Sequence, residues 1–466
     1  MQLPKDFCSQ MISILGEDEF VLLQNAIEQE RITSIRLNPL KCENLKSSVP
    51  FEKVPWCTNG FYLKERPLFT MDPLFHAGTY YAQEASSMFL EQVLSQHFDK
   101  IENDSPLVLD LCASPGGKST LLASFLNGKG WLVANEVMKT RVGILNENLT
   151  KWGAPNVTVS QNDPKDFGKL SGLFDIIVID APCSGEGMFR KDEKAIEDWS
   201  LNNVQLCSER QRRIVSDVYP ALKTGGLLIY STCTYNEEED EKNVKWISEE
   251  LDAEILSVQT EKHWDTTENT YGYHFYPHKT KGEGFFIAVL QKRENTPIMK
   301  RPSSKKSAKN KKEAIPQDVK KICKTWISGD IEEIELSSEN DTITAIGKEW
   351  TAEVELLKNN LRTIRNGVPI GFIKGKDLIP HEAFAFSSIL NKDAFPVIDC
   401  SWEESIRFLK KENITTEMYP KGFVLFCFHG IPLGFGKNLG NRCNNLFPSE
   451  WRIRMEMDKT RYVKIL

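Results

Sequence analysis

Apolar residues in the first two thirds of the chain alternate between short continuous runs and stretches with helical spacing. The continuous runs predict five strands and a late edge strand, at Pro106–Cys112, Trp131–Glu136, Asn156–Gln161, Phe174–Asp180, Gly226–Cys233 and, last, Gly284–Gln291. Helical spacing predicts helices at Lys118–Leu126, Lys139–Lys151, Val204–Leu222 and Glu237–Leu251. Such alternation is typical of an α/β fold with a mostly parallel, doubly wound sheet and helices on both faces.

Smaller units are expected on either side of this region, which we place at residues 76–293. Residues 1–75 combine an amphipathic helix at Phe7–Ile27 with a strand at Ser34–Leu40, which predicts a small α+β cap. Residues 315–466 contain short β-rich runs between turn residues, at Val368–Lys374, Phe395–Ile398 and Phe423–Phe428. We expect one or two mixed α/β or mainly β modules there.

The segment 294–314 separates the predicted sheet from the C-terminal region. It has seven basic residues between Lys300 and Lys312 and almost nothing apolar. Because it cannot bury enough surface to offset its ordering entropy, we expect a flexible basic linker. A solvated linker is favoured over a dedicated RNA-binding arm, although the two roles are compatible.

Composition narrows the class of protein. Hydrophobic residues make up 40% of the 466 positions, and the formal net charge of −7 argues mildly against nucleic acid unless basic residues cluster on one face. No leader-like start and no run of roughly 18 apolar residues is found. The eleven cysteines contain no Cys-x-x-Cys pair, and His76, His274 and His278 lack metal-ligand spacing. These features predict a cytoplasmic protein with reduced thiols and no structural metal.

A glycine pair follows the first predicted strand. Residues 110–118 read Asp-Leu-Cys-Ala-Ser-Pro-Gly-Gly-Lys, and Gly116 and Gly117 let the backbone approach a ligand just before a helix begins. A phosphate-binding P-loop is excluded, because it needs glycine where Cys112 stands. A GxGxxG motif is also absent, which disfavours a hydride-transfer enzyme.

Acidic residues stand near the ends of the first four predicted strands, namely Asp110, Glu136, Asp163 and Asp180. The carboxyl ends of parallel strands meet at the edge of the sheet where ligands bind. A carboxylate at Glu136 can accept both hydroxyl groups of a ribose, and Asp163 can accept an adenine amino group. Together with the glycine loop, these acids predict a nucleoside-containing cofactor.

Two cysteines follow the fourth and fifth predicted strands, Cys183 in DAPCSG and Cys233 in STCTY. Carbon 5 of cytosine is too weak a nucleophile to take a methyl group from a sulfonium unaided. A thiolate that adds to carbon 6 moves electron density onto carbon 5, which is covalent catalysis. Asp180 could hold the exocyclic amine as charge shifts. The chemistry alone leaves open which cysteine is the nucleophile.

Five motifs carry a resemblance to a known family: YYAQEASSM, DLCASPGGKS, DAPCSGEGMFRKD, YSTCTYNEEE and PHKTKGEGFF. They resemble the nucleolar-protein/Sun family of RNA cytosine-5 methyltransferases, and most closely its bacterial RsmF-like ribosomal RNA branch. The likeness is specific over about residues 75–290. GIPLGFGKN and NRCNNLFPSEWR look like that branch's PUA-like RNA-binding module, at about 395–466. The first 70 residues match only loosely, through SIRLNPLK.

The resemblance implies a Rossmann-like methyltransferase domain that binds S-adenosylmethionine, and an N-terminal cap that binds RNA. The implied cofactor residues are Cys112, Ala113, Ser114, Pro115, Gly116, Gly117, Lys118, Glu136, Asp163 and Asp180. Cys233 would be the nucleophile and Cys183 would assist release of the adduct, whereas DNA cytosine-5 methyltransferases use the Pro-Cys cysteine as nucleophile. The implied partner is RNA, above all small-subunit (16S) ribosomal RNA, bound by a monomer without membrane or metal.

Three residues near the motifs can be interpreted either as functional or as merely solvated or structural. Arg190 and Lys191 follow the PCSG motif, and their position favours contact with RNA phosphates over a merely solvated loop. For Lys118, a structural role is slightly favoured over contact with an acid of the site.

Other functions remain as alternatives. A transfer RNA substrate fits sister enzymes of the same family. An amino-group methyltransferase on this fold needs no thiol and usually has Pro-Pro-aromatic after the fourth strand, where this chain has Pro182 and Cys183. A non-catalytic RNA-binding factor would be expected to lack Cys233 or the glycine loop.

Overall fold

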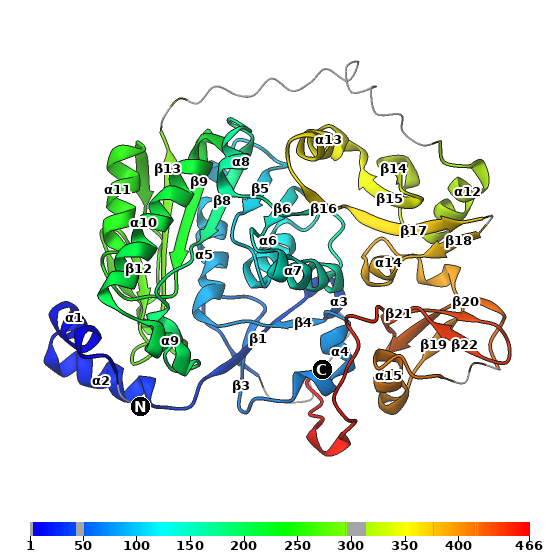
Figure 1. The fold of residues 1–466 in the computed structure, drawn as a ribbon, viewed down its shortest axis with the longest axis horizontal. Coiled ribbons are helices and arrows are strands. Elements are labelled where there is room, and N and C mark those ends of the chain that lie inside the picture. Colours follow the sequence, from blue (N-terminus) through cyan, green and yellow to red (C-terminus); the bar gives the residue numbers. More distant parts are fainter. Residues whose placement is uncertain are drawn as a thin grey trace.

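The computed structural model describes residues 3–42, 51–293, 295, 314–375, 377–414, 416 and 418–466. Apart from residues 295 and 314, the predicted basic linker lies outside the described residues. A large sheet occupies the middle of the molecule, and smaller sheets lie beside it (Figure 1). No helix in the described part of the chain has the length and apolar character needed to span a bilayer.

The central sheet has the strand order β11-β12-β13-β9-β8-β5-β6-β7-β16, and β10 pairs with β13. Five neighbouring strands are parallel and confirm the predicted doubly wound core: β5 (Leu107–Asp110), β6 (Trp131–Asn135), β7 (Val157–Ser160), β8 (Phe174–Asp180) and β9 (Leu222–Thr232). From β5 the chain builds outward through β6 and β7 on one side and through β8 and β9 on the other. This reversal is where open α/β sheets bind ligands.

Helices cover both faces of this sheet, as predicted. Side chains of α6 (Gly117–Leu126) and α7 (Lys139–Trp152) pack on one face in a single cluster with Val108 and Leu132. Side chains of α10 (Leu201–Val218) and α11 (Glu241–Glu250) pack on the other face with Leu107 and Leu109. The shorter helices α5 (Leu90–His97), α8 (Pro164–Gly168) and α9 (Glu193–Asp198) complete this part of the chain.

Two predicted elements differ from the structure. The supposed edge strand β13 (Phe285–Lys292) is interior, since it pairs with β9 and with β12 (Gly272–Phe275), and also with β10 (Ala253–Leu256). Its nearly continuous apolar residues suit burial on both faces. The single amphipathic helix is two helices, α1 (Lys5–Leu15) and α2 (Glu17–Ile27), because Gly16 between them has a φ of 84°.

The N-terminal unit is a four-stranded sheet in the order β2-β3-β1-β4. Its strands are β2 (Glu52–Lys53), β3 (Gly60–Leu63), β1 (Thr33–Leu37) and β4 (Tyr80–Ala82), so it continues past the expected boundary at Phe75. Short helices α3 (Pro39–Cys42) and α4 (Pro73–His76) complete it.

Arg36 on β1 joins the N-terminal sheet to the central domain. Its buried guanidinium donates to Gln83 (2.8 Å) and to Thr120 on α6 (2.6 Å), and lies 4.7 Å from the ring of Trp152 on α7. Burial lowers the pKa of Arg36 to about 10. One side chain therefore fixes β1 against two helices of the central domain.

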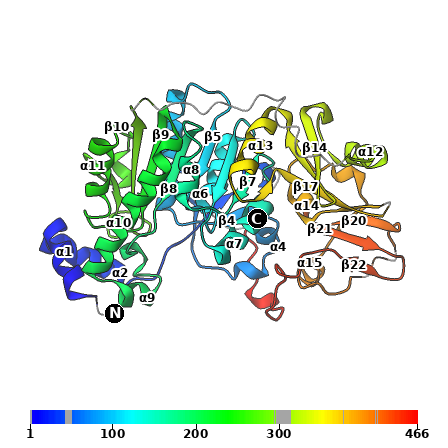
Figure 2. The ribbon, with the colours of Figure 1, turned by 45° about the horizontal axis from the view of Figure 1, so that its top comes forward.

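The C-terminal region contains two further four-stranded sheets. One consists of β14 (Ile334–Glu339), β15 (Thr342–Gly347), β17 (Val368–Lys374) and β18 (Asp377–Pro380). The other consists of β19 (Val397–Asp399), β20 (Gly422–Phe428), β21 (Ile431–Asn438) and β22 (Cys443–Asn445). Helices α12 (Gln317–Trp326), α14 (Glu382–Phe386) and α15 (Trp402–Leu409) pack around them, and Figure 2 shows these sheets at the end of the molecule opposite α1 and α2.

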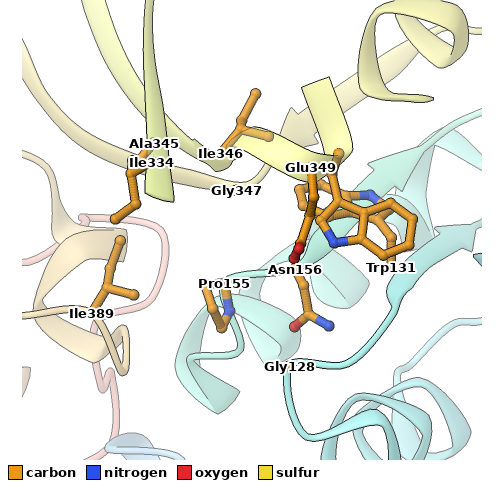
Figure 3. A pocket seen from close by; sticks show the side chains of 11 residues that line it. Gly128, Trp131, Pro155, Asn156, Ile334, Ala345, Ile346, Gly347, Glu349 and Ile389 are labelled. Atoms are coloured by element: carbon orange, nitrogen blue, oxygen red, sulfur yellow. The ribbon is translucent and has the colours of Figure 1, made fainter. Parts of the chain in front are cut away.

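Part of this region belongs physically to the central domain. Strand β16 (Thr363–Asn366) pairs antiparallel with β7, and α13 (Thr351–Asn360) shares the core of the central sheet. Trp350 packs on Trp131 with a ring separation of 5.8 Å. A mainly apolar pocket of about 160 Å³ remains at this seam (Figure 3). It adjoins the start of β6, at the edge of the sheet opposite the predicted site.

We expect Arg36→Ala to lower the free energy of unfolding by about 3 kcal/mol, because the Gln83 and Thr120 side-chain oxygens lose the buried guanidinium that donates to them. Chemical unfolding followed by circular dichroism measures this. The exposed Arg31 offers a control, since Arg31→Ala should change stability by less than about 0.5 kcal/mol. Equal effects at the two positions would contradict the anchoring role.

Candidate active site

The glycine loop lies between the carboxyl ends of β5 and β6. Gly116 immediately precedes α6 with a φ of 119°, a conformation that favours glycine. The Ala113 amide donates to the Asn135 carbonyl (2.8 Å), and the Asn148 side chain donates to the Pro115 carbonyl (2.8 Å). The loop that begins at Cys112 and ends at Lys118 is thus held at the predicted edge of the sheet.

Asp110 ends β5 and is fully buried. One carboxylate oxygen accepts a hydrogen bond from Ser119 (2.6 Å), and the other has no partner among the described residues. Burial raises the pKa of Asp110 to about 7, and the neighbouring Asp180 adds to the rise. The site therefore contains a buried acid that titrates near neutral pH.

Glu136 and Asp163 lie just beyond the ends of β6 and β7, as predicted. Glu136 accepts from the Met138 amide (2.8 Å) and lies 3.4 Å from Arg141. Asp163 caps α8 through the Lys165 amide (3.2 Å). Both carboxylates are thus fixed at the edge that carries the glycine loop.

Asp180 ends β8 and makes two polar contacts. It accepts from Ser231 (2.9 Å) and forms an ion pair with Lys118 (2.8 Å), while its side chain stays 40% exposed. The slightly favoured structural interpretation of Lys118 is therefore corrected, because its ammonium reaches an acid of the site. The length of the lysine side chain lets it cross from α6 to the end of β8.

The two cysteines lie side by side. Their strands are parallel neighbours, with Asp180 opposite Ser231, so the residues that follow meet at one edge. The sulfur atoms of Cys183 and Cys233 are 3.0 Å apart, and the Cys233 amide lies 3.4 Å from the Cys183 sulfur. The hydrogen bond to Cys233, followed by burial, raises the pKa of Cys183 well above its usual value.

Two buried glutamates hold the cysteine loops together, and the sequence analysis missed both. Glu239 accepts from the Ser184 amide (3.0 Å), Gln211 (2.7 Å) and Asn236 (2.9 Å). Glu186 accepts from the Tyr235 amide (2.8 Å), Asn236 (3.0 Å), Trp199 (3.0 Å) and Gln10 (3.1 Å). Their proximity to the cysteines in sequence was the available signal, but acids in GEG (185–187) and EEED (237–240) are typical of exposed positions.

A cluster of two acids and a histidine lies beside β9. Asp240, Glu241 and His274 present ligand-type atoms within 4.8 Å of one another, although their spacing in sequence gave no sign of it. His274 lies 2.7 Å from Glu241, and Thr232 donates to Asp240. These hydrogen bonds give each of the three side chains a partner within the protein. The expectation that the protein binds no metal stays a prediction.

Arg190 is less available than the sequence suggested. Its guanidinium pairs with Glu283 (2.8 Å) and donates to the Gly282 carbonyl, and only 4% of its side chain is exposed. Lys191 is farther from Glu283 (4.0 Å) and 23% exposed. A direct phosphate contact at either residue stays a prediction, and Lys191 is the more accessible of the two.

Comparison with known proteins identifies the family. Residues 3–85 match the N-terminal domain of the 16S rRNA methyltransferase RsmF, residues 96–291 match 16S rRNA methyltransferase RsmB/F, and residues 395–453 match the RsmF PUA domain. Ribosomal RNA small subunit methyltransferase F of Shewanella oneidensis is 32% identical over 460 residues, which cover 94% of this chain and 93% of the relative. The chain belongs to the RsmF family.

Other RsmF relatives and solved structures agree. The Pectobacterium carotovorum enzyme of the same name is 30% identical, with 96% of this chain and 95% of the relative covered. A methyltransferase homologue from Pyrococcus horikoshii is 27% identical with a TM-score of 0.52, covering 62% of this chain and 95% of that chain. NSun6 from the same organism, solved with SFG, has a TM-score of 0.52 at 20% identity, covers 63% and 99%, and shows the fold. The predicted methyltransferase fold and PUA module are confirmed.

We expect Glu239→Ala to lower the free energy of unfolding by about 3 kcal/mol, because the buried Ser184 amide loses its acceptor and Gln211 and Asn236 each lose one of theirs. The exposed Glu237 provides a matched control, and Glu237→Ala should have an effect below about 0.5 kcal/mol. Urea unfolding of the wild type, Glu239→Ala and Glu237→Ala measures these free energies. If Glu239→Ala and Glu237→Ala have the same free energy of unfolding, Glu239 does not stabilise the loops that carry the cysteines.

The buried Asp110 predicts a pH-dependent stability. Its folded-state pKa of about 7 lies above the roughly 3.9 of an unfolded aspartate, so the folded chain binds one more proton between these values. Its contribution to stability is therefore present at low pH and is lost as pH rises towards 7. Relative to wild type, Asp110→Asn should gain about 2–3 kcal/mol between about pH 5 and pH 8. If the free energies of unfolding of the wild type and Asp110→Asn change in parallel with pH, the raised pKa of Asp110 is contradicted.

Proposed function

We propose that this chain transfers the methyl group of S-adenosylmethionine to carbon 5 of a cytosine in small-subunit ribosomal RNA. The observation that carries the proposal is the pair of sulfurs, 3.0 Å apart, at the ends of β8 and β9. Membership of the RsmF family supports ribosomal RNA as the substrate, and the names of the relatives specify the small subunit. The expectation of a cytoplasmic monomer belongs to the same proposal.

The cofactor edge fits S-adenosylmethionine. The loop from Cys112 to Lys118 presents backbone beside a helix N-terminus, and one oxygen of the buried Asp110 accepts no hydrogen bond from the described residues. Glu136 would hold the ribose and Asp163 the adenine, from positions just after β6 and β7. When bound, the cofactor supplies an electrophilic methyl group. The residues of this chain orient it towards the cysteine pair.

Cys233 is the proposed nucleophile. Its sulfur adds to carbon 6 of the cytosine, so that carbon 5 becomes electron-rich enough to attack the methyl group. After a base removes the carbon 5 proton, the bond between sulfur and carbon 6 breaks and the aromatic ring is restored. The resemblance supports Cys233 as the attacking sulfur, because it stands in STCTY after the fifth predicted strand, where the family has its nucleophile.

Cys183 is proposed to assist release of the product. A thiol 3.0 Å from the Cys233 sulfur can give it a proton as the covalent adduct breaks. Asp180 is proposed to accept a hydrogen bond from the exocyclic amine of the base. Its ion pair with Lys118 and the hydrogen bond from Ser231 hold the Asp180 side chain in place at the end of β8.

The test is methylation of 16S ribosomal RNA with labelled S-adenosylmethionine, combined with a search for a covalent protein–RNA adduct on denaturing gels. Cys233→Ala should lower methylation at least about a thousandfold and form no adduct, because the nucleophile is lost. Cys183→Ala should accumulate the adduct. Cys207→Ala, at a buried cysteine on α10, should behave like wild type.

Other outcomes point elsewhere. If the behaviours of Cys233→Ala and Cys183→Ala are exchanged, the mechanism follows the DNA enzymes. If both variants methylate normally, thiol catalysis is wrong and an amino group is the acceptor. Methylation of transfer RNA in place of 16S ribosomal RNA would move the target but keep the chemistry.

A further inference from the structure

A groove of about 1040 Å³ opens between the N-terminal sheet and the central domain. One wall is formed by residues 29–33, which connect α2 to β1, and by residues 62–66 at and after the end of β3. Arg190, Lys191 and Lys281 of the central domain line the other side. The groove therefore runs along the loop that follows Cys183.

The cations of this groove fall into two groups. On the central-domain side, Arg190 and Lys191 face Glu283, and Lys281 pairs with Glu52 (2.5 Å). On the N-terminal side, the exposed Arg31, Lys64 and Arg66 make no ion pair within the described part of the chain. Two carboxylates, Glu30 and Glu65, lie among them, so the uncompensated charge there is positive.

Arg31 and Arg66 are close enough to repel each other. Burial lowers the pKa of Arg66, and the positive charge of Arg31 lowers it further. The Arg66 guanidinium is also held 5.3 Å from the ring of Phe69. Two like charges held this close together suit an anion that both can contact, and guanidinium groups match the oxygens of a phosphodiester.

The groove is connected to the cysteine pair through a short loop. The Gly187 amide donates to the Cys233 carbonyl (2.9 Å), three residues before Arg190. Arg190 in turn donates to the Gly282 carbonyl, next to Lys281. An extended strand lying in the groove would follow this loop towards the sulfurs, as a single strand carrying an unstacked target base requires.

We propose that this groove binds the phosphodiester backbone of the RNA strand beside the target cytosine, with Arg31, Lys64 and Arg66 as its phosphate contacts. The inference rests on the proposed function and adds a binding site to it. It also replaces Arg190 as the main expected phosphate contact, because Arg190 is paired with Glu283. The main contacts are instead placed on the N-terminal unit, on the other side of the groove.

The test compares two full-length double variants with the same change in net charge. Arg31→Glu/Arg66→Glu alters the groove, whereas Lys100→Glu/Lys129→Glu alters exposed lysines before β5 and β6, at the opposite edge of the sheet. Binding of transcribed 16S ribosomal RNA is measured over a series of KCl concentrations. The groove variant should bind at least about tenfold more weakly, with a salt dependence shallower by about 1.5 in log–log slope.

The matched variant should keep the wild-type slope and affinity. The groove variant should raise KM for RNA more than it lowers kcat, and calorimetry should show unchanged binding of S-adenosylmethionine. Arg31→Gln/Arg66→Gln, which removes charge without reversing it, serves as a second variant if charge reversal disturbs folding, and should give the same shallower slope.

The two proposals fail in different ways. If both groove variants bind RNA with the affinity and salt slope of the matched control, the groove proposal is overturned, while methylation by the wild type still supports the proposed function. If the wild type does not methylate RNA, the proposed function fails and the groove proposal falls with it.

Discussion

The placement of the two cysteines depends on two buried glutamates, Glu186 and Glu239, which belong to the loops that they hold together. Removing Glu186 and Glu239 from water is costly, and only dense hydrogen bonding offsets that cost. Each accepts from at least three donors on separate segments, so each ties the loop after β8 to the loop after β9. The parallel pairing of the strands brings the cysteines near each other, and these ties keep the sulfurs within 3.0 Å.

The N-terminal unit takes part in this support. Phe7 on α1 packs on Phe189 (5.0 Å) and Trp199 (5.7 Å), and Gln10 donates to Glu186. Arg36 fixes the N-terminal sheet to α6 and α7, and α6 follows the glycine loop directly. At the other end, β16 lengthens the central sheet beyond β7. The three segments that match family models are joined through hydrophobic cores that residues 3–85 share with each of the other two, and β16 lies between the second and the third segment.

Local signals explain what the sequence could predict. The parallel strands are short apolar runs, and the glycine loop and cysteines directly follow them, so their common edge follows from topology alone. Three features depended on distant partners. β13 was expected at an edge because β10 and β12 carry weak signals in the sequence, and β16 is separated from β7 by some two hundred residues. The acids of GEG and EEED are of a type that is usually exposed. Burial of Glu186 and Glu239 depends on donors such as Gln10, Trp199 and Gln211, which no local pattern connects with them.

The negative total charge of −7 is compatible with an RNA substrate because charges act locally. At physiological salt the Debye length is about 8 Å, so acids elsewhere on the surface are largely screened at the groove. Attraction of RNA to the groove depends on the cations there that are not paired with a carboxylate. Glu283 takes up Arg190 to hold the loop beside the cysteines, whereas Arg31, Lys64 and Arg66 have no such partner within the described residues. The same residue type thus stabilises the site where it is paired and is free to attract phosphate where it is not.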